Sequence, residues 1–189
     1  MLNLSAIILA AGSGSRIGTP KLKLKIDEEY FINVIIRKLS SAGVKNISAV
    51  IREDYKEWCL GNVPEALFIL NEDPEKGMFH SVKLGIINSE KSDGVIIFPV
   101  DYPFVETSTI EKLINSFEEN PTCIIKPYFE SKSGHPLIIP SQLFAFIVKN
   151  SSNENLNFVI RQSKLPIQNV NVDDKGILKN INHKEDLES

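Results

Sequence analysis

The chain has few cysteines and no long apolar run. Its two cysteines, Cys59 and Cys123, have neither metal-binding nor redox spacing, so we interpret them as free thiols in a reducing compartment. No segment approaches the roughly 20 apolar residues of a membrane span. The N-terminus lacks the basic stretch and cleavage site of a signal peptide. We therefore expect a cytoplasmic protein with no membrane partner.

The chain also lacks an excess of positive charge. Its formal net charge is −3, and its lysines and arginines are dispersed, which argues against an extended nucleic-acid surface. The expected partner is instead a small anion held in a local positive pocket. With 189 residues, of which 42% are hydrophobic, the chain is expected to bury one core and to form a single domain over residues 1–189.

Apolar runs of strand length alternate with helical patterns almost to the end of the chain. This alternation predicts an α/β fold with a largely parallel sheet and helices on both faces. The expected strands are Leu4–Leu9, Ile47–Ile51, Ala66–Leu70, Gly94–Val100, Thr122–Lys126, Pro136–Ile139 and Ile167–Val172. The expected helices are Phe31–Ala42, Tyr55–Leu60, Met78–Asn88, Thr109–Glu119, Gln142–Lys149 and Leu156–Ser163. Gly43 is expected to end the first helix, and Ser108 with Glu111 to form a capping box.

The segment 9–21, LAAGSGSRIGTPK, follows directly on the first expected strand. Gly12 and Gly14 allow the backbone to turn and to approach a ligand without a Cβ in the way. Arg16 and Lys21 supply charge-assisted hydrogen bonds to phosphate oxygens. Because ligands of such sheets lie at the carboxyl ends of the strands, this segment predicts a polyphosphate site.

The spacing of the same segment excludes two common phosphate loops. A P-loop needs Lys and then Ser or Thr after its last glycine, whereas Gly18 is followed by Thr19 and Pro20. A dinucleotide fingerprint needs two residues between its second and third glycines, and here three separate Gly14 from Gly18. Pro20 also disfavours an immediate helix start. We therefore expect a long loop whose cations reach inward.

This segment resembles the signature loop LAAGxGxR(x)GxxK of nucleotidyltransferases, and within them the MobA-like group, which includes the molybdopterin guanylyl- and cytidylyltransferases. The resemblance implies a three-layer α/β/α fold with a mostly parallel, Rossmann-like sheet of the glycosyltransferase-A-like type. It implies that Arg16, Lys21 and Asp101 are catalytic. The implied nucleotide-binding residues are Leu9, Ala10, Ala11, Gly12, Ser13, Gly14, Ser15, Arg16, Lys21, Asn71, Gly77, Ser81 and Asp101.

Asp101 ends the apolar strand GVIIFPV, two residues before Pro103. A strand-terminal carboxylate suits a hard divalent cation bound together with phosphate oxygens, although Asp also commonly opens a turn. In the family that the loop resembles, the Asp of an (L/V)xD(Q/x)P motif is the magnesium ligand, and Asp101 falls on it. The implied cofactor is therefore Mg²⁺.

A second strand ends at Asn71, and GMFHSVKLG over residues 77–85 opens the following helix. This resembles the family's N…GMxxSLxxG(L/I) segment, which closes over the nucleobase. Gly77 would allow close approach, and Ser81 would either contact the base or cap its own helix. The HSVKLG segment also resembles that of cytidylyltransferases, which makes CTP the first expectation and GTP the second.

Two further segments concern the acceptor and the metal. The motif SGHP resembles the (R)GHP element of the molybdopterin-type members, so that His135 is expected on the acceptor side, with an ordinary edge histidine as the alternative. The closing segment resembles (x)DIDTPEDL, with Asn180 and Asn182 in place of aspartates, so we expect these two amides to give a weaker metal site. The family's GDxGAR element is also altered, because Asn153 and Asn157 replace its Asp and Arg.

Together these observations predict a Mg²⁺-dependent nucleotidyltransferase. It would transfer an NMP unit, CMP first and GMP second, from CTP or GTP to a phosphorylated, molybdopterin-like small molecule and release pyrophosphate. The resemblance also implies a transient contact with a molybdoenzyme or its chaperone. Two alternatives remain, a sugar- or alcohol-phosphate nucleotidyltransferase and a non-catalytic nucleotide-binding accessory protein.

Overall fold

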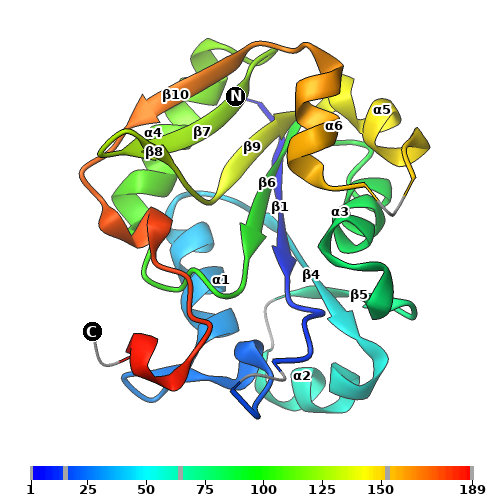
Figure 1. The fold of residues 1–189 in the computed structure, drawn as a ribbon, viewed down its shortest axis with the longest axis vertical. Helices are drawn as coiled ribbons and strands as arrows, with labels where there is room; N and C mark the ends of the chain where they lie inside the picture. The colour runs from blue at the N-terminus through cyan, green and yellow to red at the C-terminus, as the bar shows by residue number, and fades with distance from the viewer. Residues whose placement is uncertain (1, 15–16, 64–65, 152–153, 188–189) are drawn as a thin grey trace.

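A computed structural model of the chain describes residues 2–14, 17–63, 66–151 and 154–187 (Figure 1). Within these ranges the central feature is an eight-stranded sheet with the order β10-β7-β9-β6-β1-β4-β5, to which β8 adds beside β7. The strands are β1 (Leu4–Leu9), β4 (Asn46–Arg52), β5 (Leu67–Asn71), β6 (Gly94–Pro99), β7 (Ile124–Phe129), β8 (Lys132–Ser133), β9 (Leu137–Pro140) and β10 (Ile167–Asn171).

Most of the sheet is parallel. β1 pairs in parallel with β4 and β6, β4 with β5, and β7 with β10, while β9 runs antiparallel to both β6 and β7. The arrows of β1, β4 and β6 all point to the lower edge of the molecule in Figure 1, and the C-terminal segment runs to the same edge. The carboxyl ends of three strands and a segment distant in sequence therefore share one edge of the sheet.

Helices cover both faces of the sheet, as expected of buried parallel strands. Side chains from α1 (Phe31–Ser41), α2 (Lys56–Asn62) and α4 (Thr107–Glu119) join one buried cluster, and those from α3 (Met78–Ile87), α5 (Phe144–Lys149) and α6 (Leu156–Ser163) join another. Neighbouring residues of β1 separate between them, Ile8 into the first and Ile7 into the second. The predicted three-layer α/β/α fold is confirmed.

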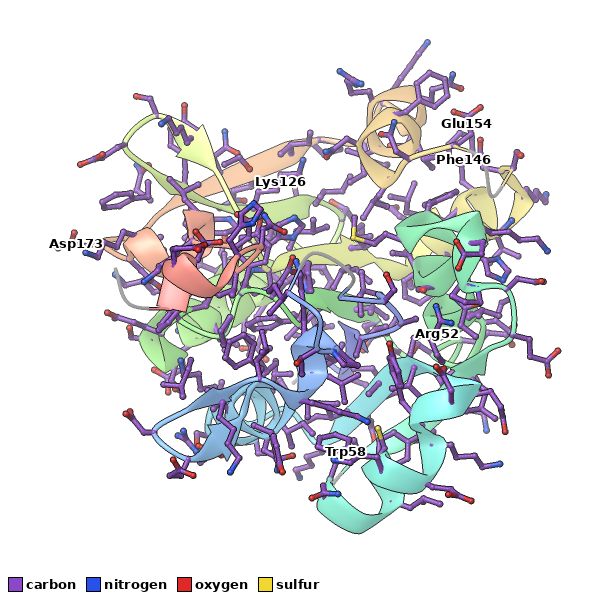
Figure 2. All side chains as sticks on the ribbon, turned by 60° about the horizontal axis from the view of Figure 1, so that its bottom comes forward. Arg52, Trp58, Lys126, Phe146, Glu154 and Asp173 are labelled. Atoms are coloured by element: carbon purple, nitrogen blue, oxygen red, sulfur yellow. The ribbon has the colours of Figure 1, made fainter. Side chains whose placement is uncertain are left out.

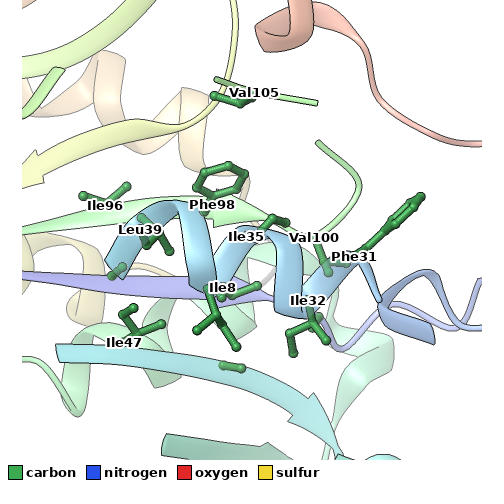
Figure 3. Close-up of a cluster of buried hydrophobic side chains, with 14 of the residues drawn as sticks. Ile8, Phe31, Ile32, Ile35, Leu39, Ile47, Ile96, Phe98, Val100 and Val105 are labelled. Carbon is green, nitrogen blue, oxygen red and sulfur yellow. The ribbon is translucent and has the colours of Figure 1, made fainter. Parts of the chain in front are cut away.

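The α1 layer shows why the sequence pattern predicts its helix. Phe31, Ile32, Ile35 and Leu39 follow helical spacing, are fully buried, and lie against β1, β4 and β6 (Figure 3). Gly43 has a φ of 87° just after the last turn, where the amide of Val44 donates to Leu39 O at 3.1 Å. This ending is the expected glycine stop, which satisfies carbonyls that the helix leaves free.

None of these helices, within the described part of the chain, combines the length and apolar character that crossing a membrane requires.

All the expected strands and helices are present; β1 and α6 have the expected bounds, and the ends of the others are shifted. The largest shift is at β7, which runs to Phe129 rather than Lys126. Three short strands were not expected: β8 and the hairpin of β2 (Lys25–Ile26) and β3 (Glu29–Tyr30). Their two-residue turns, Asp27-Glu28 and Glu130-Ser131, have positive φ at both positions. They lack the glycine that ordinarily marks such turns in a sequence, so the strands gave no signal.

The expected capping box at α4 is wrong. The helix begins at Thr107, and the Ser108 hydroxyl donates to the Glu106 carboxylate instead of capping the helix. The cap comes from the buried carboxylate of Asp174, which accepts from the Glu106 amide at 2.9 Å and from the Thr109 hydroxyl at 2.7 Å. Its other oxygen accepts from the Gly176 amide at 2.8 Å. Asp174 thus ties the C-terminal segment to the start of α4.

Candidate active site

A pocket of about 330 Å³ opens at the carboxyl ends of β1, β4 and β6. Figure 2 views the molecule with this edge turned toward the reader. The walls come from the segment after β1, from Lys21, from the start of α3 and from the end of β6. The lining residues are Leu9, Ala11, Gly12, Ser13, Gly14, Lys21, Arg52, Pro74, Glu75, Gly77, Met78, Ser81, Pro99, Val100 and Asp101.

The loop after β1 is a tight turn with open space on its pocket side. Gly14 has a φ of 62°, and its carbonyl accepts from the amides of Ile17 and Gly18 at 3.0 and 3.1 Å. A Cβ on Gly14 would lie 2.3 Å from Thr19 O, so only glycine fits there. A Cβ on Gly12 would meet no atom within 4 Å, as the prediction of ligand access requires.

Most of the predicted loop residues line the pocket, and one does not. Ala10 extends the β1 ladder by donating its amide to Val50 O at 2.9 Å, and only 1% of its surface is exposed. Ser15 and Arg16 lie outside the described residues. The Tyr55 hydroxyl donates to Gly12 O at 3.3 Å, which ties the loop to the segment after β4.

Lys21, Asp101 and Asn182 meet at one end of the pocket. The Lys21 ammonium donates to Asp101 Oδ2 at 2.8 Å and to Asn182 Oδ1 at 2.7 Å, and the two charged side chains are 20% and 21% exposed. The Ile181 amide donates to Asp101 O at 2.9 Å, which aligns the C-terminal segment with the end of β6. Asn180 is half-buried in that segment, and no described hydrogen bond joins it to Lys21 or Asp101.

The short helical turn that carries Lys21 is fixed from both sides. Leu22 is fully buried in the core, while the ammonium of Lys23 lies 5.5 Å from the ring centroid of Tyr55 and 5.1 Å from that of Trp58. Trp58 is labelled in Figure 2. Because its neighbour is buried and Lys23 packs on aromatic rings, Lys21 is directed toward Asp101 rather than into solvent.

The oxygen donors beside Lys21 suit a hard cation. The ammonium itself occupies a position between a carboxylate and an amide oxygen, which shows that these two oxygens attract positive charge. Within the described ranges, no three or more His, Cys, Asp or Glu side chains form a metal-binding group. One carboxylate with amide oxygens fits Mg²⁺, which commonly binds through one or two carboxylates together with substrate phosphates.

The wall formed by β5 and α3 contains a buried polar pair. The Asn71 amide donates to Ser81 Oγ at 3.0 Å, and its Oδ1 accepts from the Asp73 amide at 2.9 Å. Asn71 is therefore engaged in fixing the turn after β5 and lies behind the pocket lining. Ser81 and Gly77 do line the pocket, and Gly77 opens α3 with a φ of 82°.

Arg52 lines the pocket and was not predicted. It is the last residue of β4, its Nε lies 3.0 Å from Asp54 Oδ1, and its Nη1 lies 3.7 Å from Glu75 Oε1. The hydrogen bond that Arg52 donates to the Asp54 carboxylate raises the pKa of Arg52 above its ordinary value. The expected strand stopped at Ile51, so extending it by one residue would have placed a cation among the strand-end candidates. Figure 2 labels Arg52 beside β4.

Comparison with known proteins gives the family. The family model described as the MobA-like NTP transferase domain matches residues 6–167. The chain belongs to this family. It is similar to the bifunctional protein GlmU of Syntrophomonas wolfei, with 26% identity over 153 residues, 77% of this chain and 33% of GlmU. The chain thus spans about a third of the length of that curated relative.

Solved structures share the fold of this MobA-like chain. Rv0371c from Mycobacterium tuberculosis H37Rv superposes with a TM-score of 0.86 and 19% identity, covering 100% of this chain and 98% of that one. Rv0371c has also been solved in complex with manganese. The molybdopterin-guanine dinucleotide biosynthesis protein A of Archaeoglobus fulgidus gives a TM-score of 0.71 and 19% identity, covering 97% and 95%. The predicted family and fold are confirmed, and the family is one of nucleotidyltransferases.

His135 of the MobA-like chain lies beside the pocket rather than in its lining. Its ring contacts that of Tyr102 with centroids 4.9 Å apart, and its amide donates to Ile177 O at 3.0 Å. Its Nδ1 is buried without a hydrogen-bond partner in the described structure. Burial lowers the pKa of His135 to about 4, against the opposing charge of Asp101. The imidazole is therefore neutral at physiological pH.

The altered GDxGAR element falls partly outside the described structure. Asn153 is not described, whereas Asn157 is exposed on the first turn of α6. The neighbouring Asn155 caps that helix, because its Oδ1 accepts from the Phe158 amide at 2.9 Å. One of the two asparagines that replace charged residues is thus on the helix surface.

Proposed function

We propose that the chain is a Mg²⁺-dependent nucleotidyltransferase that transfers an NMP unit from an NTP to a phosphorylated acceptor. An oxygen of the acceptor phosphate attacks the α-phosphorus, the bond to the bridging oxygen breaks, and pyrophosphate leaves. The observation that carries the proposal is the meeting of Lys21, Asp101 and Asn182 beside the glycine loop. Family membership supports the reaction class.

The loop and its cations would position the triphosphate. Gly12, Ser13 and Gly14 line the pocket, and their backbone amides would bind phosphate oxygens there. Lys21 would exchange the oxygens of Asp101 and Asn182 for those of phosphate, and Arg16 would add a second cation. No residue needs to act as a base, because the acceptor phosphate is already an anion. Catalysis is then positioning and charge neutralisation.

Asp101, with the amide oxygens of Asn182 and Asn180, would hold Mg²⁺, which when bound offsets negative charge on the phosphate oxygens. The manganese complex of Rv0371c shows that a protein of this fold binds a divalent cation. The oxygen-only donor set of Asp101 and Asn182 supports magnesium here.

For the base we propose cytosine first and guanine second, with Asn71, Gly77 and Ser81 on the base side of the pocket. The HSVKLG segment supports cytosine, and the guanine dinucleotide in the name of the A. fulgidus protein supports guanine. The same name supports a molybdopterin-like acceptor near His135 and a transient contact with a molybdoenzyme or its chaperone. The free thiols of Cys59 and Cys123 support a cytoplasmic location.

A sugar- or alcohol-phosphate acceptor is the second candidate. The observation that favours it is the exposed Asn157, which replaces the charged residue of the molybdopterin-type element. The third candidate, a non-catalytic accessory protein, would not require Lys21 and Asp101 to meet at the pocket.

Pyrophosphate release tests the proposal. Each of the four NTPs, labelled at the α-phosphate, is incubated with Mg²⁺ and with molybdopterin, N-acetylglucosamine 1-phosphate or methylerythritol 4-phosphate. We expect CTP with one acceptor to release pyrophosphate and to leave the label in the product. Nucleotide binding without pyrophosphate release from any combination would favour the accessory protein.

A further inference from the structure

Two basic side chains on β7 and α6 have no acidic partner in the described part of the chain. Lys126 is half-buried in β7, and Arg161 is exposed on α6. Within the described ranges, neither side chain forms a hydrogen bond or an ion pair. The other basic groups beside the cleft differ, because Lys21 is paired with Asp101 and Arg52 with Asp54. A half-buried cation without a counter-charge is costly unless a ligand supplies one.

The fold brings Lys126 next to His135. Lys126 lies two residues after Ile124, whose side chain packs in the cluster with Val159 and Ile160 of α6, so Lys126 is on the α6 face of the sheet. The Gly134 amide donates to Pro127 O at 3.1 Å, which sets the loop before His135 against the residue after Lys126. Lys126 is labelled in Figure 2.

The electrostatics of the three groups agree with this placement. Burial first, and then the charge of Arg161, lower the pKa of Lys126. Burial, and then the charge of Lys126, lower the pKa of His135, which Asp101 opposes. Lys126 on β7, Arg161 on α6, His135 before β9 and Asp101 after β6 are the charged or titratable groups that act on one another here. The only carboxylate among them already binds Lys21.

Arg161 also stands near a position where the family motif has an arginine. That position is Asn157 in this chain, and Arg161 follows it by four residues within the single helix α6. Residues four apart share one helix face, so the guanidinium lies one turn from the missing one. The positive charge of the motif is therefore retained on the same face of α6.

We propose that Lys126 and Arg161 bind the phosphate group of the acceptor, in a subsite on the β7–α6 side that adjoins the triphosphate pocket next to Asp101. That the bound phosphate belongs to an acceptor rests on the proposed function. That an anion binds here rests only on the two cations. The ligand class is a phosphate monoester dianion. The neutral His135 ring, on which the charges of both Lys126 and Asp101 act, would contact the same phosphate, whose attacking oxygen would face the α-phosphorus.

Binding of inorganic phosphate tests the subsite directly. The full chain is saturated with Mg²⁺ and a CTP analogue that carries a methylene bridge between its α- and β-phosphorus atoms, so that the triphosphate pocket is filled and no transfer occurs. Phosphate is then titrated by calorimetry into the wild type, Lys126→Gln, Arg161→Gln and Lys126→Arg. Lys112→Gln is the control, since Lys112 is an exposed residue of α4 on the opposite face of the sheet.

We expect Lys126→Gln and Arg161→Gln each to weaken phosphate binding at least 10-fold, and Lys126→Arg and Lys112→Gln to stay within 3-fold of the wild type. Affinity for the CTP analogue should not change. Equal phosphate affinity in all five proteins, or no phosphate binding by the wild type, would overturn the subsite. Weakened CTP-analogue binding in both glutamine variants would assign the two cations to the triphosphate and would also overturn it.

The outcome separates this inference from the proposed function. If no NTP and acceptor pair releases pyrophosphate while phosphate binding still depends on Lys126 and Arg161, the anion subsite stands and the transfer reaction fails. If transfer occurs and the glutamine variants leave the KM of the acceptor unchanged, the reaction stands and the subsite fails. Arg161→Gln lies on an exposed helix face, so it keeps the test decisive if Lys126→Gln does not fold.

Discussion

The two halves of the cleft are built differently. The half around β1, β4 and β6 consists of parallel strand ends, a glycine loop and two described cations, Lys21 and Arg52, that are each paired with an acidic side chain. The half around β7, β9 and α6 is formed by a reversed strand, a half-buried neutral histidine and two basic side chains, Lys126 and Arg161, that have no acidic partner among the described residues. The described cations of the first half are already paired within the protein, whereas the second half lacks the counter-charge that a ligand would bring.

This difference predicts which property of the enzyme a substitution in each half should change. In the first half, removing one member of a pair leaves the other without its partner, so effects on chemistry should be large. In the second half, Lys126 and Arg161 form no hydrogen bond or ion pair within the described ranges, so effects should appear in acceptor binding and in pH dependence.

Asp101→Ala should give the largest effect. We expect turnover to fall by about 10³-fold or more, because the carboxylate that would hold the metal is lost while the fold is kept. Pyrophosphate release over a range of Mg²⁺ concentrations measures the loss of turnover, and circular dichroism checks that the fold is kept. Asp101→Asn is the matched variant that keeps a hydrogen-bond acceptor for Lys21. Near-normal turnover of the alanine variant would remove Asp101 from the site.

Lys21→Ala should cost about 2–4 kcal/mol in kcat/KM, and less in NTP affinity, since its charge acts mainly on charge that develops during transfer. Arg16→Ala should behave in the same way. Steady-state kinetics and calorimetry with Mg²⁺ and CTP measure the two quantities. Equal losses in binding and turnover would mean uniform ground-state binding and would contradict the catalytic assignment.

His135 should make stability depend on pH. Its pKa is lowered from 6.5 to about 4 in the folded chain. Between these values the unfolded chain therefore binds more protons, and stability rises with pH. We expect the wild type to lose on the order of 2–3 kcal/mol between pH 7 and pH 4 at this site. His135→Gln should lack that loss, and urea unfolding at a series of pH values compares the two. Parallel curves would show that His135 does not have a depressed pKa.

Asp174→Ala should lower the free energy of unfolding by about 1–3 kcal/mol, because the Glu106 and Gly176 amides and the Thr109 hydroxyl lose their acceptor. Asp173→Ala, at the exposed neighbouring position, should change it by less than about 0.5 kcal/mol. Urea unfolding followed by circular dichroism checks both. Equal effects at the two positions would mean that Asp174 does not anchor the C-terminal segment.

The sequence predicted the first half of the cleft better than the second, for physical reasons. Strands and helices follow periodicity, and the glycine loop combines residue types that few other sites need. The pairing of Lys21 with Asp101 and Asn182 joins residues far apart in the chain, so spacing could not show it. Lys126 was the last residue of the expected strand Thr122–Lys126, and no motif included it. Asp174 caps a helix from a segment 65 residues away, which no local capping pattern can reveal.

The division of the cleft is tested most directly by the double variant Asn153→Asp with Asn157→Arg, which restores the charges of the family's acceptor element. Calorimetry with CTP and Mg²⁺ is paired with turnover on molybdopterin and on sugar phosphates. We predict an unchanged affinity for CTP and Mg²⁺ and a shift of acceptor preference toward molybdopterin. Loss of CTP affinity would place residues 150–157 in the nucleotide half and contradict the division.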